Sequence, residues 1–179
     1  MQPGTVWSAS DSSVPFTRGE EEFLGKVYAE AGEGGSTNLI TILKNTTGST
    51  LTRGQVLRPD LSSAARMFGD ALLGNADSAR PAGVVCDKYK TGFTVPNGSY
   101  FRATLKSRKH KILLQTTSNA RVTLAIGDLL VMSADAGAAW GAAALTAAAY
   151  RLGFSRVVTT NGTENGSLID AVIDVNGNP

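Results

Sequence analysis

The chain has 179 residues, of which 42% are hydrophobic and 18% are charged, and its formal net charge at pH 7 is +2. A chain of this length forms one domain with a substantial core. This composition excludes a coiled coil and an acidic disordered tail, and it argues against wholesale disorder. The net charge is too small to indicate binding of nucleic acid or membranes by bulk electrostatics. No apolar run approaches a membrane span and no signal peptide is visible, so we expect no membrane partner and synthesis in the cytoplasm.

Residues 1–38 differ in composition from the rest of the chain. Small polar residues are frequent there and the apolar residues are scattered. Such a segment cannot build a core of its own. We therefore expect an extended N-terminal arm over 1–38, followed by a β-rich domain over 39–179. The aromatic residues of the arm suggest that it docks on its own domain or on a partner, and a disordered terminus is the alternative.

After residue 38 the chain alternates between short apolar segments and turns. Apolar alternation and β-branched residues predict strands, and Gly, Pro and Asn-Gly predict the turns between them. The spacing is typical of a mainly β fold, a small β-barrel or sandwich of about eight short strands. The segments 61–79 and 134–150 are expected to be long loops with at most a helical turn. The candidate strands lie at 39–43, 55–57, 84–85, 93–95, 100–106, 112–115, 122–126, 129–132, 154–159 and 168–175.

The sequence contains no recognisable reactive motif. The nearest approach to a phosphate-binding loop, at Gly19–Lys26, has five residues between its glycines and three acids where phosphates would bind. One His and one Cys cannot form a usual zinc site. We therefore predict no catalytic residues, no cofactor and no metal site, and we do not expect an enzyme.

Four basic residues follow one another at Arg108, Lys109, His110 and Lys111. A solvated basic turn or edge strand explains such a run. A contact patch for an acidic partner surface is a second interpretation. Catalysis by His110 is a third, although no acid lies nearby in the sequence to orient the imidazole.

Five stretches of the β-rich domain share a pattern of turns and short strands. A polar turn followed by Gly-x-Val lies at 45–57, a Gly-Asp-x-Leu segment lies at 125–137, and short strands lie at 82–85, 151–154 and 171–173. These stretches resemble those of the small head decoration proteins of tailed bacteriophages, which are also called cement proteins. The resemblance covers roughly residues 45–175 and implies a small β-barrel or β-tulip fold, often trimeric, without catalysis or cofactor.

The same resemblance implies a location and a mechanical role. Such proteins bind the outside of an expanded icosahedral head and clamp neighbouring major capsid subunits against the pressure of packaged DNA. We therefore expect the major capsid protein as partner, a homotrimer, and a place on the outer surface of the virion after synthesis in the host cytoplasm. The arm is expected to supply aromatic anchors, with its acidic residues facing basic capsid residues. These candidates are Trp7, Phe16, Phe23 and Tyr28, with Glu20, Glu21 and Glu22.

Two other functions stay open. A nucleic-acid-binding barrel would use Tyr100, Phe101 and Arg102 with the cations of 108–111 as a basic face carrying aromatic residues, although direct nucleic-acid binding is not expected. A trimeric β-fold hydrolase of a small molecule would need convergent acids, and the sequence shows none in a tight motif.

Overall fold

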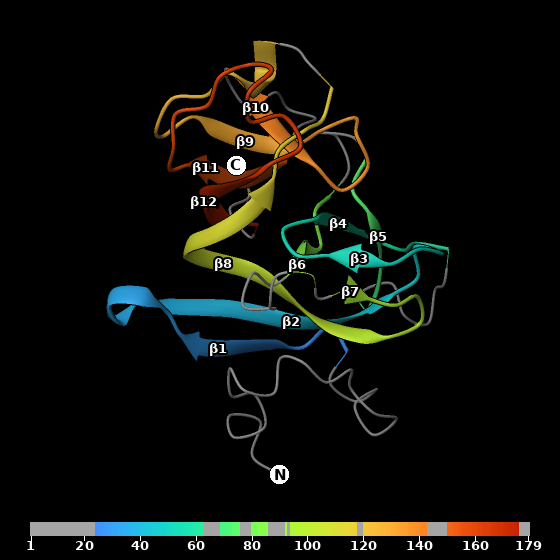
Figure 1. Ribbon diagram of the computed structural model, residues 1–179. Helices are drawn as coiled ribbons and strands as arrows, with labels where there is room; N and C mark the ends of the chain where they lie inside the picture. Colours follow the sequence, from blue (N-terminus) through green and yellow to red (C-terminus); the bar gives the residue numbers. More distant parts are fainter. Residues whose placement is uncertain are drawn as a thin grey trace.

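The structure is a computed structural model that describes residues 24–62, 69–75, 80–85, 92, 94–117, 120–142 and 150–175. Strands dominate these residues, so the predicted mainly β class is confirmed (Figure 1). None of the helical segments in the described residues has the length and apolarity of a membrane-spanning helix. The strands are β1 (Val27–Ala31), β2 (Thr37–Asn45), β3 (Leu51–Thr52), β4 (Val56–Pro59), β5 (Asp70–Leu73), β6 (Gly83–Val85), β7 (Thr94–Val95), β8 (Tyr100–Leu113), β9 (Leu129–Met132), β10 (Ala139–Ala142), β11 (Arg151–Ser155) and β12 (Leu168–Asp174).

Five strands form a closed circuit of backbone pairing, which we call the first ring. β2 pairs with β5, β5 with β4, β4 with β6, β6 with β8, and β8 again with β2. The β2–β5 pairing is parallel and the others are antiparallel. The small β3–β7 sheet contributes Leu51 and Val95 to the core of this ring. Closure leaves few unpaired strand edges, which protects a β protein from edge-to-edge association.

The second half of β8 belongs to another circuit, which we call the second ring. β8 pairs with β12, β12 with β11, β11 with β9, and β9 with β10, all antiparallel. A parallel bridge between Leu114 and Ala139 joins β10 back to the end of β8. β8 therefore passes from the lower group of strands into the upper group in Figure 1.

Strand alternation divides the apolar residues between two cores. In β4, Leu57 lies in the first core and Val56 in the second, and in β6, Val85 and Val84 divide in the same way. Successive side chains of a strand point to opposite faces, so β4 and β6 form a wall that both cores share. The first core is completed by Leu43, Ala71, Phe101 and Ala103, and the second by Ile112, Leu114, Val122, Leu124, Leu130, Met132, Ala139, Leu152, Ile169, Ala171 and Ile173.

Five predicted elements differ from the structure. The segments expected to be loops contain strands, β5 within 61–79 and β10 within 134–150. The strand expected at 122–126 is instead a 3₁₀ turn, η3 (Ala120–Val122), followed by a single bridge from Leu124 to Thr159. The strands expected at 100–106 and 112–115 are joined, because β8 runs without a break to Leu113.

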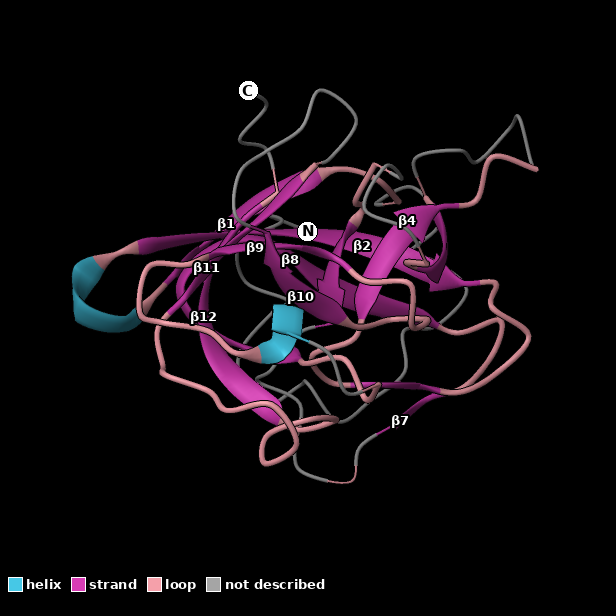
Figure 2. Ribbon diagram, turned by 90° about the horizontal axis from the view of Figure 1, so that it is seen from above, coloured by secondary structure: helices cyan, strands magenta, loops and turns pink. Residues whose placement is uncertain are grey.

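The predicted arm divides into two parts. Residues 1–23 lie outside the described residues. The part from residue 24 onward belongs to the main sheet: β1 pairs with β2 in antiparallel register, and Leu24 bridges to Ile42. The 3₁₀ turn η2 (Glu33–Gly35) connects β1 to β2 and projects from one end of the molecule (Figure 2). Residues 24–38 are thus part of the folded sheet, which corrects their prediction as an extended arm.

An aspartate fastens the end of β8 to the β9–β10 connection. The backbone N–H groups and the hydroxyls of Thr116 and Thr117 all donate to the Asp135 carboxylate, at distances between 2.7 and 3.1 Å. The hydrogen bond from the Thr116 hydroxyl is the largest of the effects that hold the pKa of Asp135 below its ordinary value of 3.8. This cluster lies beside the bridge that completes the second ring.

We expect Asp135→Asn to lower the free energy of unfolding by about 1 kcal/mol at pH 7, because the hydrogen bonds to the charged carboxylate are lost. The folded pKa is lowered, so the stabilisation is present above the ordinary value and disappears as the pH falls through the folded pKa. Urea unfolding at neutral pH and at a pH below this pKa measures the difference. An equal deficit at both pH values would contradict the assignment.

Candidate functional site

The basic run at 108–111 lies at a β-bulge in the middle of β8. Ala171 pairs with His110 and Ile173 pairs with Ser107, so Val172 alone faces the two residues Arg108 and Lys109. Ser107 holds the bulge: its hydroxyl donates to the Lys109 carbonyl at 2.8 Å and accepts the Lys109 N–H at 3.3 Å. A bulge of this kind bends the strand and changes which face the following side chains occupy.

The bulge turns two neighbouring cations toward solvent. Arg108 and Lys109 are both exposed, whereas an uninterrupted strand would place them on opposite faces. His110 is 2% exposed, and its Nδ1–H donates to the Lys111 carbonyl at 2.6 Å. His110 therefore does not belong to an exposed basic patch, which corrects its inclusion there. Its imidazole is a buried structural group, with one nitrogen bound to backbone.

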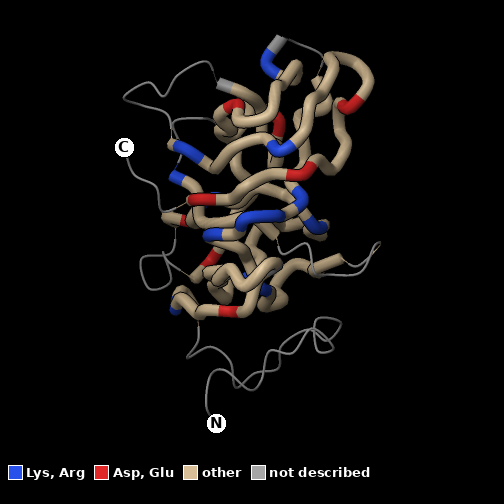
Figure 3. The backbone as a smooth tube through the Cα atoms, turned by 90° about the vertical axis from the view of Figure 1, so that its left-hand side faces the viewer, with Lys and Arg blue, Asp and Glu red and all other residues tan. Residues whose placement is uncertain are grey.

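A groove runs beside the bulge, with a volume of about 390 Å³. Two cations of β8, Lys106 and Arg108, line it, and both are exposed. Basic segments gather across the middle of the face shown in Figure 3. The other lining residues come from the β1–β2 connection and from the β8–β12 pair: Gly35, Ser36, Thr37, Ser107, Val172, Ile173 and Asp174.

Asp174, which lines the groove, and Asp170 of the same strand are each engaged by another cation. The Asp174 carboxylate accepts a hydrogen bond from Arg151 Nη2 at 2.9 Å. Asp170 pairs with Lys111, with 2.9 Å between Nζ and Oδ1. In the part of the chain that the structure describes, neither Lys106 nor Arg108 has an ion-pair partner. The groove thus carries two positive charges that no described acid compensates.

Arg156 adds a further cation near the bulge. It follows β11, its backbone N–H donates to the Asp170 carbonyl at 3.0 Å, and its Nη1 donates to the Arg108 carbonyl at 3.1 Å. Neither Arg156 nor Lys106 was predicted from the sequence to be a site residue. The alternation of polar and apolar residues over 100–106 could have predicted that Lys106 is exposed. No local pattern could have placed Arg156 at the bulge, because only the β11–β12 pairing brings it there.

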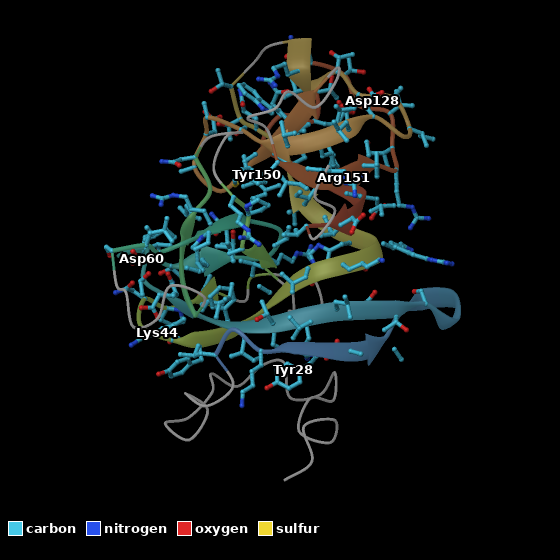
Figure 4. All side chains as sticks on the ribbon, turned by 180° about the vertical axis from the view of Figure 1, so that it is seen from behind. Tyr28, Lys44, Asp60, Asp128, Tyr150 and Arg151 are labelled. Carbon is cyan, nitrogen blue, oxygen red and sulfur yellow. The ribbon has the colours of Figure 1, made fainter. Side chains whose placement is uncertain are left out.

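Tyr28 is the one predicted arm anchor among the described residues. It lies on β1, is half-buried, and pairs in register with Ile40 (Figure 4). Tyr28 is thus a residue of the sheet, and its role as a partner anchor stays a prediction. The other predicted anchors and the acidic trio lie outside the described residues: Trp7, Phe16, Phe23, Glu20, Glu21 and Glu22.

The basic face carrying aromatic residues, which a nucleic-acid-binding barrel requires, does not form at 100–102. Phe101 is 1% exposed and lies in the first core. Arg102 is 2% exposed and forms an ion pair with Glu30 of β1. Burial lowers the pKa of the Arg102 guanidinium. Neither residue can contact a nucleic acid in this structure, so that part of the alternative is wrong.

Convergent acids are not seen in the described residues either. A cavity of about 170 Å³, lined in part by β1, β2 and β5, has a single carboxylate, Asp70, among its described lining residues, which are otherwise largely apolar. Within the described ranges, no three His, Cys, Asp or Glu side chains are grouped so that they could hold a metal ion.

Comparisons with known proteins find likenesses among solved structures. No protein-family model matches the chain, and no curated protein matches it. The chain is similar to the crystal structure of the head fibre gp8.5 N base of bacteriophage phi29, with 13% identity and a TM-score of 0.46, over 77% of this chain and 95% of that chain. At this identity and TM-score, we draw no conclusion about the fold or the function of this chain from the likeness.

Proposed function

We propose that this chain is a structural protein of a virus particle, which binds the outside of an expanded icosahedral head and clamps neighbouring major capsid subunits. The observation that carries the proposal is the groove beside the β8 bulge, where Lys106 and Arg108 present two cations that have no ion-pair partner among the described residues. The resemblance of residues 45–175 to phage decoration proteins supports the assignment to a virion. The mainly β fold agrees with the fold that this resemblance implies.

A clamp of this kind acts through binding equilibria and needs no reactive centre. Any protein that binds the assembled shell more tightly than its separated subunits stabilises the shell by mass action. If the chain is a trimer, as we propose, three weak contacts joined in one particle gain about 10²–10⁴ in avidity over a single contact. A modest surface such as the basic groove is then sufficient for stable attachment.

We further propose that residues 1–23 supply a second contact through Trp7, Phe16 and Phe23. Large aromatic side chains at the centre of an interface contribute most of its binding energy. The acidic trio at 20–22 would add exposed ion pairs of at most about 1 kcal/mol each. Substitution of the aromatic residues is therefore a stronger test of this second contact than substitution of the acidic residues.

Co-sedimentation with the expanded, undecorated heads of the same virus tests the proposal. We expect the full-length protein to bind saturably, and the variant Lys106→Glu with Arg108→Glu to bind at least about tenfold more weakly, because reversed charges repel an acidic surface. Lys26→Glu with Arg80→Glu, which reverses two exposed cations outside the groove and changes the net charge by the same amount, is the matched control. Trp7→Ala with Phe16→Ala tests the arm in the same assay.

Two results would contradict the proposal. One is that the unaltered protein does not sediment with the heads at any concentration. The other is that Lys26→Glu with Arg80→Glu weakens binding as much as the groove variant, since the effect would then follow net charge and not the groove. Light scattering of the free and head-bound protein measures whether it is a trimer.

A further inference from the structure

The groove has the composition of a site for a negatively charged extended segment. Lys106 and Arg108 line it, and Asp174, its one acid, is already bound to Arg151. Ser36 and Thr37 add polar residues to the lining, and Val172, which is half-buried, adds apolar surface. Its volume of about 390 Å³ falls in the range of about 300–1,000 Å³ typical of ligand pockets, which is room for a few residues of a peptide.

The two cations differ in the geometry that they can recognise. An arginine guanidinium presents a planar fork of N–H donors that matches a carboxylate with two parallel hydrogen bonds. A lysine ammonium acts as a point charge that accepts a wider range of geometries. Residues 106 and 108 are two apart in β8, so regular strand alternation sets both cations on one exposed side of the strand, with Ser107 buried between them.

We propose that the groove binds an acidic extended peptide segment of the partner protein, with one carboxylate on Arg108 and a second on Lys106. This inference rests on the proposed function, in which the partner is the major capsid protein, and it adds the chemistry of the contact. The β1–β2 connection at Gly35–Thr37 forms the opposite wall, so the segment lies between that connection and the β8–β12 pair.

A protein carboxylate fits this groove better than a nucleic acid does. Single strands bind to surfaces that combine cations with exposed aromatic side chains, on which the bases stack. None of the residues that line the groove is aromatic, and Phe101 is buried in the first core. The net charge of +2 also gives little of the general attraction that a polyanion requires.

Fluorescence anisotropy with short labelled peptides tests the inference on the full-length protein. One probe alternates Glu and Ser, the matched probe alternates Gln and Ser, and a labelled oligo-dT strand is the third. We expect the Glu peptide to bind, the Gln peptide to bind at least about tenfold more weakly, and added salt to weaken the Glu peptide further.

Two variants that each neutralise one charge distinguish an effect on peptide binding from an effect on folding. Lys106→Gln and Arg108→Gln change exposed side chains, so the urea midpoint should stay unchanged while affinity for the Glu peptide falls severalfold in each. Arg80→Gln should bind this peptide as the unaltered protein does. Equal binding of the Glu and Gln peptides, or tighter binding of oligo-dT than of the Glu peptide, would overturn the inference.

The outcomes also separate this inference from the proposed function. Attachment to heads without selective binding of the Glu peptide would overturn the inference and leave the function standing. Selective peptide binding that the groove variants abolish, without attachment to heads, would support the chemistry of the groove and refute the capsid as its partner.

Discussion

Gly153→Ala is expected to disrupt the second ring and to leave little folded protein. An ideal Cβ at this position would lie 1.8 Å from the Val172 carbonyl oxygen and 2.8 Å from its carbonyl carbon, and the backbone φ of +156° is one that L residues rarely adopt. The neighbouring atoms are backbone of β12, which is paired on both sides, with β8 and with β11. They cannot move aside without breaking that pairing.

We expect this substitution to lower the free energy of unfolding by about 3–5 kcal/mol, in the range of exceptional single-residue effects. That is a large fraction of the total stability of about 5–15 kcal/mol for an ordinary domain. Leu152, beside Gly153, is fully buried in the second core, so displacement of β11 would also expose apolar surface. Urea unfolding followed by tryptophan fluorescence, together with soluble yield, measures the effect.

Gly162→Ala is the matched control for Gly153→Ala. Gly162 also has a positive φ, +90°, but a Cβ built there meets no atom within 4 Å. We expect only the conformational cost of a residue with positive φ, about 1–3 kcal/mol at most. Equal stability loss in the two variants would show that the φ values, and not the contact with Val172, decide the effect.

Arg102→Met is expected to be the second strongly destabilising change. The Arg102 side chain is 2% exposed and the side chain of its ion-pair partner, Glu30, is 12% exposed. Removal of one member of a buried ion pair leaves the other charge buried without compensation, at a cost of about 3–5 kcal/mol. We therefore expect a fall of that size in the free energy of unfolding.

The double variant Glu30→Met with Arg102→Met isolates the interaction. Because both charges are removed and apolar side chains of similar volume replace them, we expect it to regain most of the lost stability. Additive losses in the two single variants and the double variant would refute the coupling. Glu30 lies on β1 and Arg102 on β8, so this pair fastens the first strand of the sheet across β2.

The groove and the N-terminal strand depend on one another in this fold. The β1–β2 connection forms one wall of the groove, and the Glu30–Arg102 pair helps to hold β1 in place. We therefore expect variants that loosen β1 to weaken peptide binding even though they leave Lys106 and Arg108 unchanged. A deletion that tests the arm should end at residue 23, before Leu24 bridges to Ile42.

Strands with strong alternation or a continuous apolar run could be predicted from the sequence. Residues 39–43 and 129–132 lie in β2 and β9, and 100–106 lies in β8. β5 and β10 were missed, because each is four residues long and lies in a segment rich in Ala and Gly. Their strand conformation depends on pairing with β4 and β9, which no local pattern records.

The candidate site was predictable only in part. The run of basic residues at 108–111 identified the right stretch of chain, but a regular alternation cannot show a bulge. The extra residue at the bulge exposes both Arg108 and Lys109 and leaves His110 buried. The groove needs the β1–β2 connection beside β8, a contact between residues far apart in the sequence.

Composition and short-range periodicity were sufficient to predict three properties of this protein: a mainly β fold, a modest net charge, and a basic segment near residue 108. These properties follow from side-chain polarity at a spacing of two residues, which local sequence contains in full. Only the tertiary structure decided that β8 is shared by two rings, that Arg102 is buried against Glu30, and that Lys106 and Arg108 face a common groove. Each of these depends on the register between distant strands, which is set when apolar faces of several segments are buried together.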